Sequence, residues 1–252
     1  MIKLPAKKSV IEKDLFKYVT LIYGREKIGK TSLAAQFPDA VFLMFEPGAK
    51  SLEIYRIDIN SWTDFLDALK LLKESDRFKT VVIDTVDLAF KYCADYICKK
   101  LCITHPADED WGKAYGLIRD EFAKQLSILS KLDRGLILIS HSEDREIKRI
   151  KGELNQSRPT LATQGRRVVE PMVDIFGYYS YDDNQRYLQI RGSEEVSAGC
   201  RLTSNFVGVD KIEMGRSAEE AFKNFISAFE TTKKGGGGQS TKPKMKVKLR
   251  RS

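Results

Sequence analysis

The most informative part of the sequence is a nine-residue loop, Gly24-Arg25-Glu26-Lys27-Ile28-Gly29-Lys30-Thr31-Ser32. It fits the pattern G-x-x-x-x-G-K-[ST], in which glycines let backbone N–H groups turn inward around phosphate oxygens. The strand-forming run Tyr18–Tyr23 precedes this loop, and a short helix is expected to follow from Lys30 to about Gln36. A strand, the loop and a helix in that order are the context in which the pattern binds a nucleotide. The sequence therefore predicts a nucleotide site formed by all nine residues of the loop.

Two side chains of this phosphate loop have specific expected roles. Lys30 can reach the β- and γ-phosphates, and the Thr31 hydroxyl can bind Mg²⁺. An acid at the end of a buried strand should complete the metal site, and Asp84 ends the apolar strand Thr80–Asp84. A helix cap is the alternative role for Asp84, and Asp87 is the runner-up ligand, although it also suits a cap. We expect ATP, or a similar nucleoside triphosphate, with Mg²⁺.

Hydrolysis needs a group that orients or deprotonates the attacking water. Glu46 follows the strand Val41–Phe45 and precedes Pro47 and Gly48, which places it at the sheet edge where ligands bind. His141 follows the strand Gly135–Ser140 at the same edge, where it could sense the γ-phosphate. An exposed loop carboxylate and a simple strand-end cap are the alternatives for these two residues. We predict catalytic roles for Glu46, Lys30 and His141.

Strand and helix patterns alternate along the chain, which predicts an α/β domain with a mostly parallel central sheet flanked by helices. Apolar residues at helical spacing predict helices at Trp62–Lys73, Val86–Leu101, Lys113–Lys131 and Ala218–Phe229. The alternating runs Ile175–Tyr181 and Arg186–Arg191 predict an antiparallel hairpin toward the C-terminal end.

The positive net charge of the chain is confined to its last residues. The 252-residue chain has 43 basic and 35 acidic residues, and eight of the basic ones lie in residues 231–252, which contain no acid. Removing those eight leaves residues 1–230 formally neutral. Four consecutive glycines, Gly235–Gly238, open the tail and cannot hold a fixed backbone cheaply. We expect a folded domain at 1–230 and a flexible basic tail at 231–252, which either tethers nucleic acid or is simply solvated.

No apolar run reaches the roughly 20 residues that span a membrane, and no apolar stretch follows the charged Met1–Lys8 as in a secretory signal. The chain has four cysteines, too few for a disulfide framework, so we expect a reducing cytoplasm. Cys93, Cys98 and Cys102 lie close together with His105 after them. Helix packing and a metal site are both open, and the spacing favours packing because it contains no CxxC pair.

Several segments carry a family resemblance. The phosphate loop, Phe45–Gly48, Val82–Thr85 and Leu138–His141 resemble the RecA-like ATPases. The chain is more closely similar to the compact, phage-encoded RecA-like proteins that bind nucleotides or anneal single strands. Further matching stretches are Asp110–Gly116, Ile139–Ile147, and Arg166-Arg167 ahead of Val173-Asp174. The resemblance covers roughly residues 16–205.

This resemblance implies a RecA-like P-loop NTPase core without added domains, in the host cytoplasm. It implies ATP hydrolysis and action on single-stranded DNA in recombination, by annealing or strand pairing. Lys30 and Thr31 would contact phosphate and magnesium, Asp84 the metal, Glu46 the water and His141 the γ-phosphate, where RecA proteins usually have glutamine. RecA-like proteins assemble as rings or filaments, so the resemblance implies a homo-oligomer in which Arg166 or Arg167 of a neighbour stabilises transition-state charge. A single-stranded-DNA-binding protein is a further possible partner.

The segment 142–163 is expected to form a basic loop or ribbon. Its basic residues are Arg145, Lys148, Arg149, Lys151 and Arg158, and the corresponding RecA-like segment holds single-stranded DNA. Four acids dilute this charge: Glu143, Asp144, Glu146 and Glu153. Trp111 and Tyr115 could stack on bases, although aromatic residues beside a helix start more often pack in a core.

Two other functions use the same loop. A P-loop phosphotransferase of the kinase type would need an acceptor site and would turn over ATP without DNA. A nucleotide-dependent switch would bind ATP without hydrolysing it. No base-reading motif in the sequence distinguishes ATP from GTP.

Overall fold

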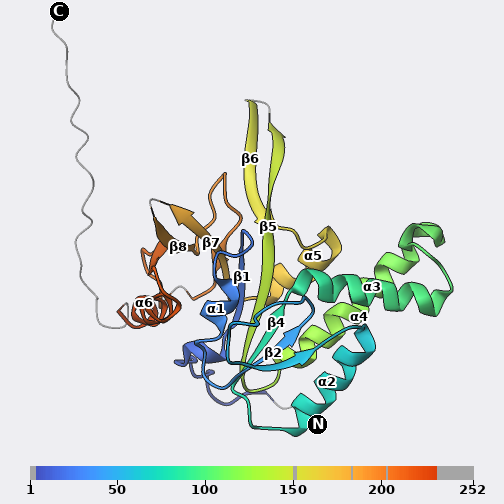
Figure 1. Ribbon diagram of the computed structural model, residues 1–252, viewed down its shortest axis with the longest axis horizontal. Coiled ribbons are helices and arrows are strands. Elements are labelled where there is room, and N and C mark those ends of the chain that lie inside the picture. The colour runs from blue at the N-terminus through green and yellow to red at the C-terminus, as the bar shows by residue number, and fades with distance from the viewer. Residues whose placement is uncertain (1–3, 150–151, 183, 203, 232–252) are drawn as a thin grey trace, which may run out of the picture.

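Strand β1 (Val19–Gly24) lies inside the central sheet, with β5 on one side and β7 on the other, both parallel to it. The computed structural model describes residues 4–149, 152–182, 184–202 and 204–231 (Figure 1). All six residues of β1 are buried. A strand covered on both faces by helices is apolar along nearly its whole length, which explains why Thr20 is the one aliphatic hydroxyl in Val19–Tyr23.

The sheet joins ten strands, and its main path has the order β10-β8-β7-β1-β5-β4-β2-β3. From β7 to β3 all neighbours are parallel, whereas β7, β8 and β10 pair in antiparallel fashion. The α/β class, the parallel centre and the antiparallel hairpin are therefore confirmed. The strands after β1 are β2 (Ala40–Met44), β3 (Tyr55–Asp58), β4 (Thr80–Asp84), β5 (Gly135–Arg149), β6 (Gly152–Pro159), β7 (Ile175–Asp182), β8 (Gln185–Gln189), β9 (Gly199–Cys200) and β10 (Lys211–Gly215).

Helices cover both faces of the sheet (Figure 1). One apolar core joins the sheet to α2, α3, α4 and α5, through residues such as Phe65, Phe90 and Phe122. The other joins it to α1 and α6 through Leu33 and Phe225. The helices are η1 (Leu15–Lys17), α1 (Lys30–Ala34), α2 (Trp62–Glu74), α3 (Val86–Leu101), η2 (Pro106–Asp108), η3 (Asp110–Gly112), α4 (Lys113–Ser130), α5 (Thr163–Met172) and α6 (Ala218–Thr231).

Strand β5 is much longer than the predicted Gly135–Ser140. Its first half pairs with β1 and β4, and from Ser142 to Arg149 it pairs only with β6. The predicted loop or ribbon is therefore an antiparallel two-stranded ribbon, in which residues 142–149 pair with residues 152–159 and project beyond the sheet (Figure 1). It continues the strand that passes through the middle of the sheet.

The exposure of the cysteine side chains and of Trp111 tests two predictions about their surroundings. Cys93 and Cys98 are buried and Cys102 is exposed, and the described residues contain no group of three or more His, Cys, Asp and Glu able to hold a metal ion. Packing therefore explains the two buried cysteines. The core placement considered for Trp111 is wrong, because its side chain is fully exposed between α3 and α4.

Residues 232–252, which make up nearly all of the predicted tail, lie outside the described residues. No described helix is long and apolar enough to cross a membrane.

Gly135→Ala is expected to lower the free energy of unfolding by about 1–3 kcal/mol, the usual cost of overpacking. A Cβ at Gly135 would lie 2.1 Å from the backbone oxygen of Phe16, which cannot rotate away. Gly116→Ala is the matched control, since a Cβ there meets nothing within 4 Å inside helix α4. That change should stabilise the protein by about 0.5–1 kcal/mol. Urea unfolding measures both, and equal effects would contradict the close approach at Gly135.

Candidate functional site

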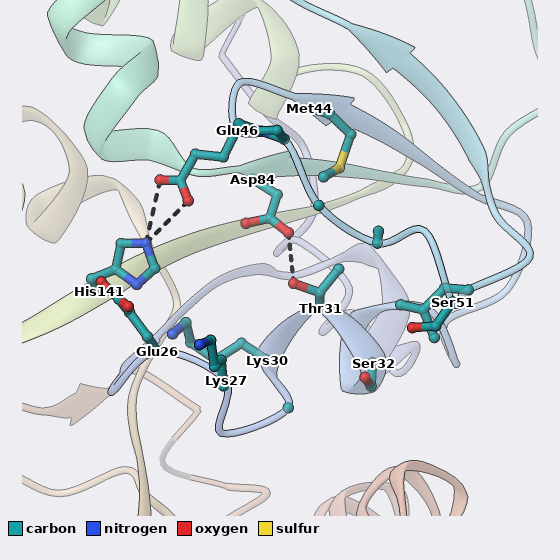
Figure 2. Close-up of a pocket in the computed structure, with 15 residues that line it drawn as sticks. Glu26, Lys27, Lys30, Thr31, Ser32, Met44, Glu46, Ser51, Asp84 and His141 are labelled. Atoms are coloured by element: carbon teal, nitrogen blue, oxygen red, sulfur yellow. Dashed lines mark hydrogen bonds and ion pairs between the residues drawn. The ribbon is translucent and has the colours of Figure 1, made fainter.

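The phosphate loop, Glu46, Asp84 and His141 meet at one edge of the sheet. In the strand register Gly24 lies opposite His141, and Asp84 lies between Met44 and Ile139. These positions are the carboxyl ends of parallel strands, where ligands of α/β sheets bind. A cavity of about 550 Å³ opens there (Figure 2). Its lining includes Glu46, Asp84, His141 and six loop residues: Glu26, Lys27, Gly29, Lys30, Thr31 and Ser32.

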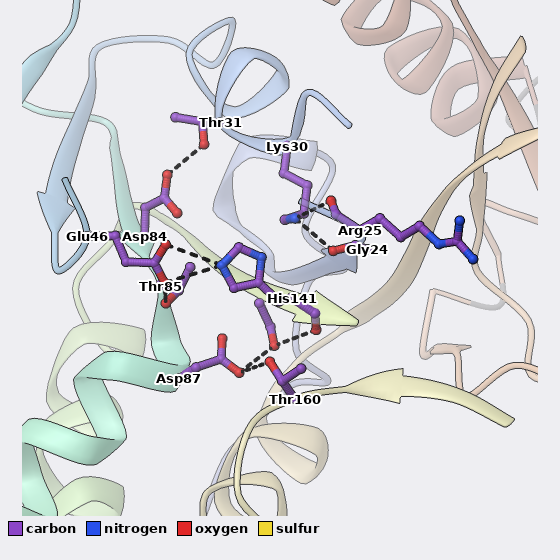
Figure 3. A network of polar contacts seen from close by, with 11 residues as sticks. Gly24, Arg25, Lys30, Thr31, Glu46, Asp84, Thr85, Asp87, His141 and Thr160 are labelled. Carbon is purple, nitrogen blue, oxygen red and sulfur yellow. Dashed lines mark hydrogen bonds and ion pairs between the residues drawn. The ribbon is translucent and has the colours of Figure 1, made fainter. Parts of the chain in front are cut away.

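The glycines of the loop meet two different requirements. Gly29 has a φ of 105°, a backbone conformation that favours glycine. A Cβ at Gly24 would lie 2.2 Å from the backbone oxygen of Tyr179, so glycine permits the close approach of β1 and β7. Gly24, Arg25 and Ile28 do not line the cavity. They contribute backbone, and the Arg25 side chain points away from His141 and Lys30 (Figure 3).

Lys30 is a buried cation held by the loop itself. Its side-chain nitrogen donates hydrogen bonds of 2.8 Å to each of the carbonyl oxygens of Gly24 and Arg25 (Figure 3). The residue is only 5% exposed, and burial lowers the pKa of its ammonium group, while the nearby Asp84 carboxylate opposes this shift. A buried ammonium at the cavity wall gains most from an anionic partner, and this fits phosphate.

Thr31 and Asp84 form the predicted metal pair. The Thr31 hydroxyl donates a 2.7 Å hydrogen bond to Asp84 Oδ2 (Figure 2). Asp84 is 6% exposed, and burial raises the pKa of its carboxyl group, while the Thr31 hydrogen bond opposes the shift. Hydroxyl and carboxylate oxygens are the ligands that Mg²⁺ prefers, so this pair fits the ion. Asp84 contacts the loop side chain and does not act as the cap of α3.

Glu46 and His141 are in direct contact. His141 Nε2 lies 3.3 Å and 3.2 Å from the two carboxylate oxygens of Glu46. The Thr85 hydroxyl donates a 2.6 Å hydrogen bond to Glu46 Oε1 (Figure 3). The carboxylate is directed toward His141 at the cavity wall (Figure 2). The side chains of Glu46 and His141 are about one-third and one-quarter exposed. The sequence predicted Glu46 and His141 separately and missed their contact. It also missed Thr85, whose only signal was its place directly after Asp84.

Asp87, the runner-up metal ligand, has a different place in the structure. Its Oδ1 accepts hydrogen bonds from Ser140 at 2.9 Å and from Thr160 at 2.7 Å (Figure 3). Burial raises the pKa of its carboxyl group, which these two hydroxyls oppose. Asp87 therefore joins the start of α3 to β5 and to the residue after β6. Thr85, not Asp87, occupies the cap position of α3, which corrects the expectation of a cap.

The arginine candidates lie on α5, outside the cavity lining. Arg166 forms an ion pair with Glu170 at 3.9 Å, and its side chain is 17% exposed. Burial lowers the pKa of its guanidinium group, as does the nearby Arg158. Arg167 is exposed. Of the two, Arg167 has the accessibility that contact with another molecule requires.

The basic residues of the ribbon differ in how free they are. Arg158 is neutralised by Glu143, with a nitrogen–oxygen distance of 2.6 Å. Arg145 is exposed and has no ion-pair partner among the residues that the structure describes. The side chains of Lys148 and Arg149, and the whole of Lys151, fall outside the described parts of the chain. Arg145 is therefore the described ribbon cation best placed for a phosphate.

A residue far along the chain supports the phosphate loop. Arg186 of β8 donates a 2.9 Å hydrogen bond from Nε to the Ile28 carbonyl oxygen. Its Nη1 also contacts the Arg216 carbonyl oxygen, just before α6. This contact could not be predicted from local sequence patterns, because 158 positions separate Arg186 from Ile28.

Comparison with known proteins agrees with this geometry. Residues 17–202 match the family described as AAA domain. A curated relative, the SPbeta prophage-derived uncharacterized protein YorG of Bacillus subtilis (strain 168), is 28% identical over 176 residues. That alignment covers 66% of this chain and 50% of the relative, so the match spans about half the length of that protein.

Proposed function

The chain belongs to the AAA domain family, a P-loop ATPase type of domain, and from this premise we propose that it hydrolyses ATP and acts on single-stranded DNA. The observation that carries the proposal is the convergence of Lys30, the Thr31–Asp84 pair and the Glu46–His141 pair on one cavity. Phosphate-binding, metal-binding and water-activating groups are then present together, as hydrolysis requires.

In the proposed reaction Glu46 is the general base. A water oxygen forms a bond to the γ-phosphorus while the bond from that phosphorus to the β–γ bridging oxygen breaks. The proton of the water passes to Glu46, and ADP and phosphate are released. Thr85 and His141 act as positioning residues, because both contact the Glu46 carboxylate.

Lys30 and the metal pair hold the phosphates in this proposal. The Lys30 ammonium exchanges its carbonyl partners for the β- and γ-phosphate oxygens. Thr31 and Asp84 would hold Mg²⁺, which would supply positive charge against these phosphates. The phosphate oxygens thereby come to lie beside the side chains that the loop and β4 already place at the cavity wall.

The ribbon is the proposed contact for DNA. His141 is the last β5 residue paired with β1, and Ser142 is the first paired with β6. The backbone oxygen of His141 also accepts a hydrogen bond from Thr160 N at 3.0 Å. His141 contacts Glu46 and immediately precedes Ser142, the first residue of the ribbon. A movement of Glu46 on ATP binding could therefore reach the ribbon through His141. Annealing or strand pairing by a phage-type, RecA-like protein is the recombination role that this arrangement supports best.

ATP hydrolysis is expected to rise when single-stranded DNA is added, and DNA affinity to fall steeply with salt. Arg145→Ala should lower the slope of log K against log salt by about one, because one phosphate contact is lost. Lys73→Ala, an exposed cation on α2, is the matched control and should change neither quantity.

Two further proteins complete this experiment. Lys30→Ala should lose nucleotide binding, and a chain ending at Thr232 separates the ribbon from the tail. If the wild type bound no DNA at low salt, the DNA part of the proposal would be wrong. Loss of DNA binding only in the shortened chain would move the contact to the tail. Hydrolysis unaffected by DNA would favour a phosphotransferase.

A further inference from the structure

A second cavity lies directly beside the phosphate loop. It has a volume of about 280 Å³ and shares three lining residues with the main cavity: Gly29, Ser32 and Leu52. The two cavities are therefore neighbours with common walls. The remaining wall comes from the end of α1, from the β7–β8 hairpin and from the start of α6. The hairpin touches the phosphate loop through the contact of Arg186 with Ile28 and the close approach of Tyr179 to Gly24.

The polarity of a bound nucleotide directs its nucleoside toward this second cavity. The groups that would act on the γ-phosphate, Glu46 and His141, lie at one end of the main cavity (Figure 2). Ser32 lies toward the other end, beyond Thr31 (Figure 2). A triphosphate with its γ-phosphate near Glu46 therefore presents its α-phosphate and nucleoside on the Ser32 side. Ser32 is also where the two cavities adjoin.

From this placement we infer that the second cavity is the subsite for the ribose and base of the nucleotide, an inference that rests on the proposed ATP binding. Small-molecule sites combine apolar walls with a few polar groups that fix orientation. Leu52 and Ala218 supply apolar surface, and Tyr179, 1% exposed, lies at the buried side. The volume is close to the lower end of the range of about 300–1,000 Å³ for whole ligand sites, which suits one part of a ligand.

Gln36 is the polar group that fits a base edge. Its side-chain amide makes no hydrogen bond within the described part of the chain, although it lines the cavity. A glutamine amide both donates and accepts, and it matches the donor–acceptor pair on the edge of adenine. Gln36 is therefore the candidate residue for base preference, which no sequence motif supplied.

The cavity is held in shape by Arg186. This residue lines it and joins Ile28 of the loop to the Arg216 carbonyl before α6. The base subsite thus combines residues in or near the loop with residues of β7, β8 and α6, which lie far along the chain. The Arg186 side chain connects these walls to the phosphate site.

Blocking the second cavity is expected to weaken ATP binding without weakening phosphate binding. Gln36→Trp and Ala218→Trp fill it from two different elements. Titration calorimetry with MgATP should show the Kd rising by about tenfold or more, equivalent to at least about 1.4 kcal/mol. Titration with magnesium tripolyphosphate, which has no nucleoside, should give a Kd within about twofold of wild type, because the phosphate contacts are intact. Lys223→Trp, on the exposed side of α6, is the matched control and should bind both as wild type does.

The pattern of results separates this inference from the proposed function. Circular dichroism first establishes that each variant is folded, and two independent blocking positions guard against the failure of one. Wild-type affinity for ATP in both variants would overturn the subsite alone. An equal loss of ATP and tripolyphosphate binding would also overturn the subsite. The substitutions would then have weakened the phosphate loop and not a contact with the nucleoside. Wild-type protein that bound neither ligand would overturn the proposed function and the subsite with it.

Discussion

Glu46→Gln is expected to slow ATP hydrolysis by about 10²–10⁴-fold, the range that loss of a general base produces. The amide keeps the shape of the side chain and can still accept the Thr85 hydrogen bond, which is 2.6 Å long in the wild type. It cannot take a proton from water. ATP binding should persist, because the phosphate contacts come from Lys30 and the loop. Steady-state phosphate release measures the rate, and calorimetry measures the binding.

The control for this change is Glu53→Gln, an exposed carboxylate on the same connection between β2 and β3. It should hydrolyse ATP at the wild-type rate. If Glu46→Gln retained more than about a tenth of the wild-type rate, a general base would have to be sought elsewhere. If wild-type protein showed no hydrolysis at all, the switch function would replace the enzyme.

Asp84→Asn is expected to abolish magnesium-dependent hydrolysis while making the protein more stable. Losing a metal ligand removes several kcal/mol of charge stabilisation, which lowers the rate by about 100-fold or more. The free energy of unfolding should increase, because burial of the Asp84 carboxyl group raises its pKa and so disfavours its charged form in the folded protein. Asparagine carries no such charge. The asparagine oxygen can still accept the Thr31 hydrogen bond.

The pH dependence of this stability difference has a definite sign. Because the pKa of Asp84 is raised on folding, the folded protein binds more protons than the unfolded chain between the ordinary pKa of an aspartate and the raised one. The stability of the wild type therefore falls as pH rises through that window. The Tm of Asp84→Asn minus that of the wild type should be smallest below about pH 4 and should increase as the pH rises.

Thermal unfolding of the two proteins without Mg²⁺ or nucleotide, from acid to neutral pH, measures this difference. Asp95→Asn, an exposed carboxylate on α3, should show no such trend. A Tm gap that stayed constant with pH would mean that Asp84 is not the buried titrating group.

The sequence predicted the parts of this protein that depend on local pattern. The strand before the phosphate loop and the strand that ends at Asp84 were predicted because each is an apolar run. The phosphate loop and Asp84 were predicted because they are the polar segments that end those runs. Helix α3 was predicted at its observed bounds, Val86–Leu101. The parallel centre followed from the alternation of strands and helices.

The features that escaped prediction depend on distant partners. Residues 142–149 are polar apart from Ile147, and they form a strand because β6 pairs with them. Helix α5 contains Gly165 and Pro171, which oppose helix formation locally, and packing of Val169 into the core outweighs them. The contact between Glu46 and His141 joins residues 95 positions apart. A single sequence carries no direct signal for such a contact.

The continuity of β5 gives the molecule a lever. The base of this lever arm is held two pairs beyond the sheet. Ser157, which pairs with Asp144, exchanges backbone hydrogen bonds with Glu195 and Ser197 and accepts one from the Tyr23 hydroxyl. The part of β5 beyond these contacts, Arg145–Arg149, reaches about 16 Å at about 3.3 Å per residue. A rotation of about 10° at its base would carry the far end through about 3 Å, close to the spacing of about 3.4 Å between successive phosphates of one duplex strand.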